Sequence, residues 1–331
     1  MNRKKCFCLL VSLAMARSAE AITLDPFAWM KVDYGFSKDY FGEENGKDQM
    51  GTAQVALGTE ANYENLVFTG LIGADRLSIL GEGPIFEIRE TYFEWNKVGG
   101  TNLSASFGVQ PFLFGLKATG FTGDRSLIPS LEFSPMGPDS FVVSSQTVPS
   151  VKLRYDFMDN AILTVGAFDN NLTNAFRGAP PDNGSNILDN QFAYLRVHGG
   201  GWLAGLYGFA GTERAYVGRD VDETRYVFDG GLGFKIPLVD ISGEYISIPE
   251  AIAGTEDRET LLVGELTAMP GDQYSAYADY STALESKVQT LRFGVMAKSH
   301  DILTWIFEYS LNIPNGQENT QGYVGRALIA F

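Results

Sequence analysis

The chain ends on Tyr323-Val324-Gly325-Arg326-Ala327-Leu328-Ile329-Ala330-Phe331, a stretch in which two kinds of side chain alternate. The odd-numbered positions are aromatic, small or aliphatic, whereas Arg326 lies among the even-numbered ones. Because successive side chains of a strand point to opposite faces, this alternation predicts a β-strand with two different faces. The chain end of a soluble protein usually frays and gains little from an exposed Phe. The closing strand of a barrel in a membrane gains more, because it must pair with the first strand and face lipid.

This ending resembles the C-terminal signature of bacterial outer-membrane β-barrels, an alternating, aromatic-rich strand with Phe in last place. The resemblance implies a transmembrane barrel in the bacterial outer membrane, with outer-membrane lipid as its surroundings.

The N-terminus has the pattern of an export signal. Arg3, Lys4 and Lys5 supply a positive region, an apolar run follows from Cys6 to Met15, and Ala19-Glu20-Ala21 is an A-x-A cleavage site. We therefore expect residues 1–21 to be a cleaved signal peptide and residues 22–331 to form one domain. The alternative is a membrane anchor, but the apolar run is too short to span a bilayer as a helix. The only cysteines, Cys6 and Cys8, lie inside this segment, so the mature chain has no disulfide.

The mature chain is acidic. Cleavage removes four of 25 basic residues and one of 40 acidic residues, which leaves 21 basic against 39 acidic residues and a net charge of −18. Nucleic acid is excluded as a partner, because its binding needs a basic surface. The balance favours cations or neutral solutes in any pore, although acidic loops facing divalent-rich lipopolysaccharide explain it equally well. Mean hydropathy is −0.05, and no stretch of 18 consecutive apolar residues follows the signal, so a helical membrane protein is excluded.

Period-two patterning with turn residues between the runs predicts sixteen strands. They are expected at 27–39, 50–62, 64–75, 85–97, 102–110, 147–157, 160–169, 191–198, 201–210, 223–236, 239–248, 259–269, 272–281, 287–298, 301–312 and 321–331. Tight turns such as Pro237-Leu238 alternate with longer links, as in outer-membrane barrels. The expected fold is an all-β, transmembrane, antiparallel up-and-down β-barrel. Fourteen or eighteen strands are alternatives, because one misread hairpin changes the count by two.

The strands separate apolar from charged side chains. In strand 301–312, Trp305 and Phe307 share a face opposite Glu308, and in strand 147–157 Lys152 and Arg154 oppose an apolar face. A soluble sandwich would show the same alternation with its apolar face inward. We place the charges in the lumen, because a charge facing lipid at mid-membrane costs about 2–4 kcal/mol.

The third long link, residues 111–146, is much longer than an ordinary connection and too apolar for a disordered surface loop. It has the ordinal place of the loop that folds into the barrel of sixteen-stranded general porins, which this chain resembles in architecture. The resemblance implies a channel narrowed by this loop and a homotrimer. It also implies a set of constriction candidates on the loop and the neighbouring wall, namely Asp124, Arg125, Glu132, Asp139, Lys152 and Arg154. The alternative is an extracellular hairpin packed over the mouth.

Strand 85–97 carries Arg89-Glu90-Thr91-Tyr92-Phe93-Glu94-Trp95, which is similar to an Arg-Glu-Ala-Tyr stretch of several substrate-selective porins. If Phe93 and Trp95 face lipid, the intervening residues line the pore and favour sugar or cation passage. A structural girdle with lumenal salt bridges is the alternative. The other pore-lining candidates are Glu90, Tyr92, Glu94, Arg196, Arg292 and Arg326, and further lumen candidates are Lys31, Asp33, Asp240, Glu244, Glu265, Asp279 and Glu308.

Enzymatic function is not expected. His198 and His300 both map to the tight-turn side, away from the extracellular rim where outer-membrane phospholipases and omptin-type proteases act. No cysteine, histidine cluster or calcium-binding pattern predicts a metal site, and no motif predicts a cofactor. The expected function is a porin that passes small hydrophilic solutes and ions by passive diffusion. The alternatives are a channel selective for sugars or cations and an adhesive barrel with a closed lumen.

Overall fold

The computed structural model describes most of the chain beyond the predicted signal peptide, which lies outside the described residues. The described residues are 22–38, 53–75, 85–111, 115–116, 147–158, 160–168, 190–215, 225–249, 257–271, 273–300, 302–316 and 319–330.

These residues contain sixteen strands and two short 3₁₀ turns. The first eight strands are β1 (Thr23–Lys38), β2 (Ala53–Tyr63), β3 (Leu66–Asp75), β4 (Ile85–Trp95), β5 (Leu103–Pro111), β6 (Thr147–Met158), β7 (Ala161–Phe168) and β8 (Asn190–His198). The second eight are β9 (Leu206–Ala215), β10 (Arg225–Ile236), β11 (Val239–Ile248), β12 (Glu259–Gly271), β13 (Tyr274–Ala283), β14 (Gln289–His300), β15 (Leu303–Ile313) and β16 (Thr320–Ala330). The 3₁₀ turns are η1 (Val98–Gly100) and η4 (Gly201–Leu203).

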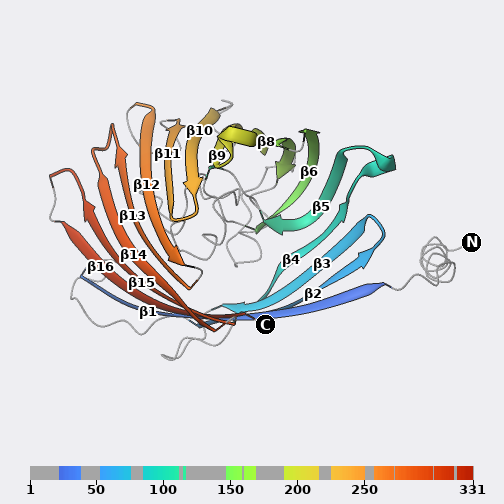
Figure 1. Cartoon of the computed structure of the whole chain (residues 1–331), viewed down its shortest axis with the longest axis horizontal. Helices are drawn as coiled ribbons and strands as arrows, with labels where there is room; N and C mark the ends of the chain where they lie inside the picture. The colour runs from blue at the N-terminus through green and yellow to red at the C-terminus, as the bar shows by residue number, and fades with distance from the viewer. Residues whose placement is uncertain are drawn as a thin grey trace, which may run out of the picture.

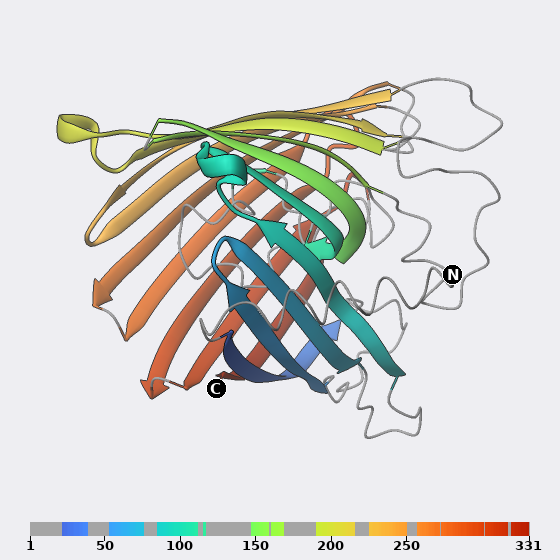
Figure 2. The same ribbon diagram turned by 90° about the vertical axis from the view of Figure 1, so that its right-hand side faces the viewer.

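The strands form one closed barrel in which each strand pairs antiparallel with its neighbours in sequence. β1 closes the barrel by pairing with β2 on one side and β16 on the other, as in the pairs Ala28 with Leu57 and Met30 with Ile329. Figure 1 shows β1 beside β16, and in Figure 2 the strands run obliquely, side by side. The expected all-β, up-and-down barrel is confirmed.

The two faces of the strands differ as the sequence predicts. On β14 and β15, Phe293 and Phe307 point outward and are 47% and 57% exposed, whereas Arg292 and Glu308 point inward and are 4% and 5% exposed. A sandwich would bury its large apolar side chains, so the exposed outer belt excludes that alternative. No helix within the described residues is long and apolar enough to cross a membrane.

The ninth predicted strand was misplaced. It was expected at 201–210, but β9 runs over Leu206–Ala215 because the turn after β8 is longer than a glycine pair. η4 occupies its middle, and Gly205 ends it at a φ of +105°, where an added Cβ would lie 2.2 Å from the Lys235 carbonyl oxygen. A side chain at this position is excluded both by its backbone conformation and by the close approach of β10.

Most connections at one end of the barrel are short, and we call this the short-turn end. It carries the turns at Glu64-Asn65 and Pro237-Leu238, whereas the link between β5 and β6 leaves from the opposite, long-loop end. One connection at the long-loop end is also short, namely the turn at 284–288 between β13 and β14.

Two tyrosines brace the inner wall in the same way. Tyr207 on β9 crosses Gly233 on β10 and donates a hydrogen bond to Asp240 Oδ1 on β11 at 2.6 Å. Tyr277 on β13 crosses Gly294 on β14 and donates to Glu308 on β15. We call these two arrangements the tyrosine braces. Each ties three consecutive strands together, because the glycine leaves room for the ring.

Candidate functional site in the barrel interior

The first described residues of the third loop lie inside the barrel. The Leu116 backbone N–H donates to Glu244 Oε1 on β11 at 2.6 Å. A Cβ added to Gly115 would lie 2.9 Å from Glu244 Oε1 and 3.0 Å from Asp229 Oδ2 on β10. Both carboxylates are on the inner face, so the loop contacts the wall of β10 and β11 from within.

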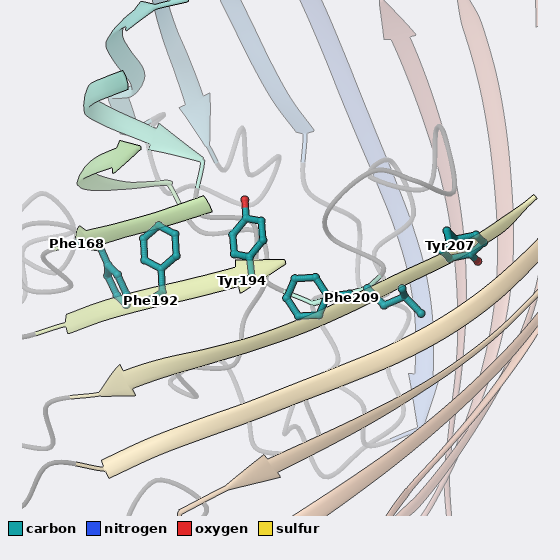
Figure 3. Close-up of a cluster of buried hydrophobic side chains, with 6 residues drawn as sticks. Phe168, Phe192, Tyr194, Tyr207 and Phe209 are labelled. Carbon is teal, nitrogen blue, oxygen red and sulfur yellow. The ribbon is translucent and has the colours of Figure 1, made fainter. Parts of the chain in front are cut away.

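An aromatic cluster receives Leu116 on the wall. Leu116 is fully buried, and the residues buried with it are Phe168, Phe192, Tyr194, Tyr207 and Phe209. Figure 3 shows these rings projecting from β7, β8 and β9 toward the same side. The centroids of Tyr194 and Phe209 are 5.4 Å apart, and those of Phe192 and Tyr194 are 6.0 Å apart. We call this cluster the aromatic anchor, because it holds the loop base against the wall.

A polar cavity lies on the inner wall over β4–β8, toward the short-turn end. Its volume is about 300 Å³, and we call it the wall pocket. Five of the candidate residues come together in its lining, namely Tyr92, Glu94, Lys152, Arg154 and Arg196. Phe93 and Trp95, which alternate with the first two, are 47% and 48% exposed on the outer face.

Opposite charges are interleaved around the wall pocket. Arg154 is held by Asp156, with Nε donating to Oδ1 at 2.9 Å and Nη2 donating to Oδ2 at 3.2 Å. The Lys152 ammonium lies in the field of the Glu94 and Glu90 carboxylates. Arg196 lies in the field of the Asp156 carboxylate, and its side chain is hydrogen-bonded to Tyr194. The pocket therefore presents cationic donors and anionic acceptors together.

The remaining candidates lie elsewhere. Arg292 is buried in the wall and pairs with Asp279, with Nε donating to Oδ1 at 2.8 Å. Arg326 is in β16, opposite Asp33 of β1 and Ile306 of β15 in register. The four loop candidates Asp124, Arg125, Glu132 and Asp139 lie outside the described residues.

Sequence reasoning did not identify the aromatic anchor or the role of Leu116. The sequence of strand β8 nevertheless indicates it. Phe192 and Tyr194 share the period-two face with Arg196 and therefore point inward. Large aromatics on the charged face of a barrel strand need a partner inside the barrel, and Leu116 is that partner. Among the described residues, no group of three or more His, Cys, Asp or Glu side chains is placed to hold a metal ion.

The sequence matches no protein-family model and no curated protein. Solved structures are nevertheless similar over nearly the whole chain. OmpT, an outer membrane protein of Vibrio cholerae in its trimer form, is 14% identical, with a TM-score of 0.60 over 94% of this chain and 100% of that one. The Rhodopseudomonas blastica porin is 11% identical, with a TM-score of 0.62 over 93% and 100%. OmpF of Salmonella typhi, in complex with daunomycin, is 12% identical, with a TM-score of 0.62 over 93% and 97%. The chain therefore has the fold of outer-membrane β-barrel porins, without a close relative among them.

Proposed function

We propose that this protein is an outer-membrane porin that passes small hydrophilic solutes and ions by passive diffusion through a water-filled lumen. The observation that carries the proposal is the placement of Gly115 and Leu116 inside a closed barrel with a charged inner wall. In this proposal the loop narrows the interior, which is what a size-selective diffusion channel needs.

The outer surface supports a membrane location. Large apolar side chains are exposed on strands all around the barrel, for example Phe93 on β4, Phe228 on β10 and Phe307 on β15. Such an outer belt is stable only when lipid covers it. In this proposal residues 1–21 direct export and are removed, the short-turn end faces the periplasm, and the long loops face outward.

Solutes are selected by the size of the narrowed passage and by the charges beside it. The loop residues Asp124, Arg125, Glu132 and Asp139 contribute to the constriction in this proposal, and Lys152, Arg154 and Arg196 provide cationic groups on the wall. No catalytic step is assigned to any residue.

The assembly is proposed to be a homotrimer. The Vibrio cholerae OmpT structure, which has the same fold, is described in a trimer form. Chemical cross-linking of the protein in native membranes is expected to give a band three times the mass of the protomer, and a monomer alone would refute this part of the proposal.

Conductance in a planar lipid bilayer tests the channel itself. The refolded protein is expected to give open, stable current steps, and a salt gradient across the bilayer measures ion selectivity from the reversal potential. A barrel that is folded, as judged by heat-dependent electrophoretic mobility, and yet gives no current would refute the porin proposal. That result would favour the alternative of an adhesive barrel with a closed lumen.

A further inference from the structure

Among the described residues, the cations of the wall pocket are matched by carboxylates in and beside its lining. Lys152, Arg154, Arg196 and one carboxylate, Glu94, line the pocket, and Glu90 and Asp156 act on these cations from outside the lining. Since the two sets balance, a solute with a net charge gains little from the pocket as a whole. A solute that offers many neutral hydrogen-bonding groups can use both sets, because guanidinium and ammonium groups only donate and carboxylates only accept.

Part of the polar lining is already oriented. Ser106 Oγ donates to Gln110 Oε1 at 2.8 Å, and Gln110 Nε2 donates to the Ser150 carbonyl oxygen at 3.0 Å. Arg154 is held by its two hydrogen bonds to Asp156. Groups fixed in this way lose little conformational freedom when a solute arrives, which favours binding.

The pocket also contains two tyrosines. Tyr92 and Tyr194 line it, and Tyr194 is held in place by the rings of Phe192 and Phe209. A tyrosine presents an apolar ring and a polar hydroxyl together. A pyranose has the complementary arrangement, with an apolar C–H face and a rim of hydroxyl groups. A volume of about 300 Å³ is at the lower end of the range for small-molecule sites, which suits one monosaccharide.

We propose that the wall pocket is a binding subsite for a neutral, hexose-sized sugar. This inference rests on the proposed porin function, because the sugar reaches the pocket through the lumen. Such a subsite gives the channel a preference for sugars over other small solutes. Inorganic phosphate or a zwitterionic amino acid would match these donors and acceptors less completely than a sugar does, since each concentrates its charge on few atoms.

Glucose titration tests the subsite by two independent measurements. The first is the decrease in ion current through the refolded channel, and the second is calorimetry of the refolded protein in detergent. Glu94→Gln keeps the shape of the side chain but removes its charge. The matched control is Asp25→Asn, an exposed inner-face carboxylate on β1 outside the pocket, which accepts a bond from Asn62 Nδ2 at 3.3 Å. Heat-dependent electrophoretic mobility verifies the fold of each variant.

We expect glucose to reduce the current to a plateau in the wild type and in Asp25→Asn. The dissociation constant should rise about tenfold in Glu94→Gln, because hydrogen bonds to charged groups are the stronger ones. 2-Deoxyglucose should bind more weakly, because a site built around a hydroxyl is left with unpaired groups without it.

The proposal is overturned if glucose lowers the current linearly and equally in all three proteins. Saturation by glycine or inorganic phosphate in place of glucose overturns the sugar assignment. If the folded protein carries no current, the porin function fails, and calorimetry still decides whether the pocket binds glucose. Heat of glucose binding that disappears in Glu94→Gln supports the subsite in that case, and its absence from the wild type refutes it.

Discussion

At the scale of single residues, Leu116 fixes the base of the third loop to the inner wall. Its side chain is fully buried against aromatic rings, and its backbone N–H is bound to Glu244. The preceding Gly115 has a φ of +105° and fits between two carboxylates. The loop base is therefore fixed by packing, by a charge-assisted hydrogen bond and by a backbone conformation that favours glycine.

We expect Leu116→Ala to loosen the loop base. Removing a buried leucine side chain costs about 2–5 kcal/mol, and this cost falls on the contact between loop and wall. Single-channel recordings should show a larger conductance or frequent switching between levels. The matched control is Leu57→Ala, because Leu57 is 64% exposed on the outer face and its truncation leaves no cavity. A folded Leu116→Ala variant with wild-type current steps would contradict the role assigned to the anchor.

Glu259 is the second residue with a local task. Its Oε1 accepts the N–H groups of Thr260 and Glu285 at 2.9 and 3.0 Å, and its Oε2 accepts the N–H of Ser286 at 2.9 Å. Glu259→Ala should cost about 1–3 kcal/mol locally, because three donors lose a charged acceptor. Amide hydrogen exchange in the turn at 284–288 should become faster, while Glu285→Ala, which removes an exposed carboxylate from the same turn, should leave it unchanged. Equal exchange rates in both variants would argue against this role of the Glu259 carboxylate.

At the scale of strands, the tyrosine braces depend on glycine in the middle strand. A Cβ at Gly294 would lie 2.1 Å from the Tyr277 ring, and a Cβ at Gly233 would lie 2.1 Å from the Tyr207 ring. Gly294→Ala must therefore displace Tyr277 from Glu308. Overpacking of this kind costs about 1–3 kcal/mol. The temperature at which the barrel unfolds in heat-dependent electrophoresis should fall.

Gly264→Ala is the matched control for the brace. Gly264 is also in a strand, β12, but an added Cβ there meets no atom within 4 Å. The unfolding temperature of this variant should equal or exceed that of the wild type, since alanine in a strand interior is favoured over glycine. If both glycine variants lose stability equally, the braces do not contribute in the way described.

At the scale of the whole molecule, the features that can be predicted from the sequence are those that recur in every strand. Period-two alternation and turn residues identify the sixteen strands and their outward faces, because each strand carries its own evidence, such as Phe293 next to Arg292. The contact of Leu116 with Glu244 spans 128 residues, and Tyr277 reaches Glu308 across a third strand. Such contacts depend on how distant strands meet in the closed barrel, and a single sequence has no local pattern that reports them.

The difference between the outer and inner faces of the barrel can be tested by introducing an arginine at either of two adjacent residues. Val295 is 52% exposed on the outer face in the middle of β14, and Met296 follows it on the inner face. Val295→Arg should destabilise the barrel in lipid vesicles by about 2–4 kcal/mol, because an arginine facing lipid at mid-membrane is costly. Met296→Arg adds the same side chain to the polar interior and should fold with nearly wild-type stability. Urea titration of the vesicle-bound protein, followed by tryptophan fluorescence, measures both. Equal losses of stability in the two variants would mean that both faces meet similar surroundings. That result would contradict a lipid-embedded barrel with a hydrated interior.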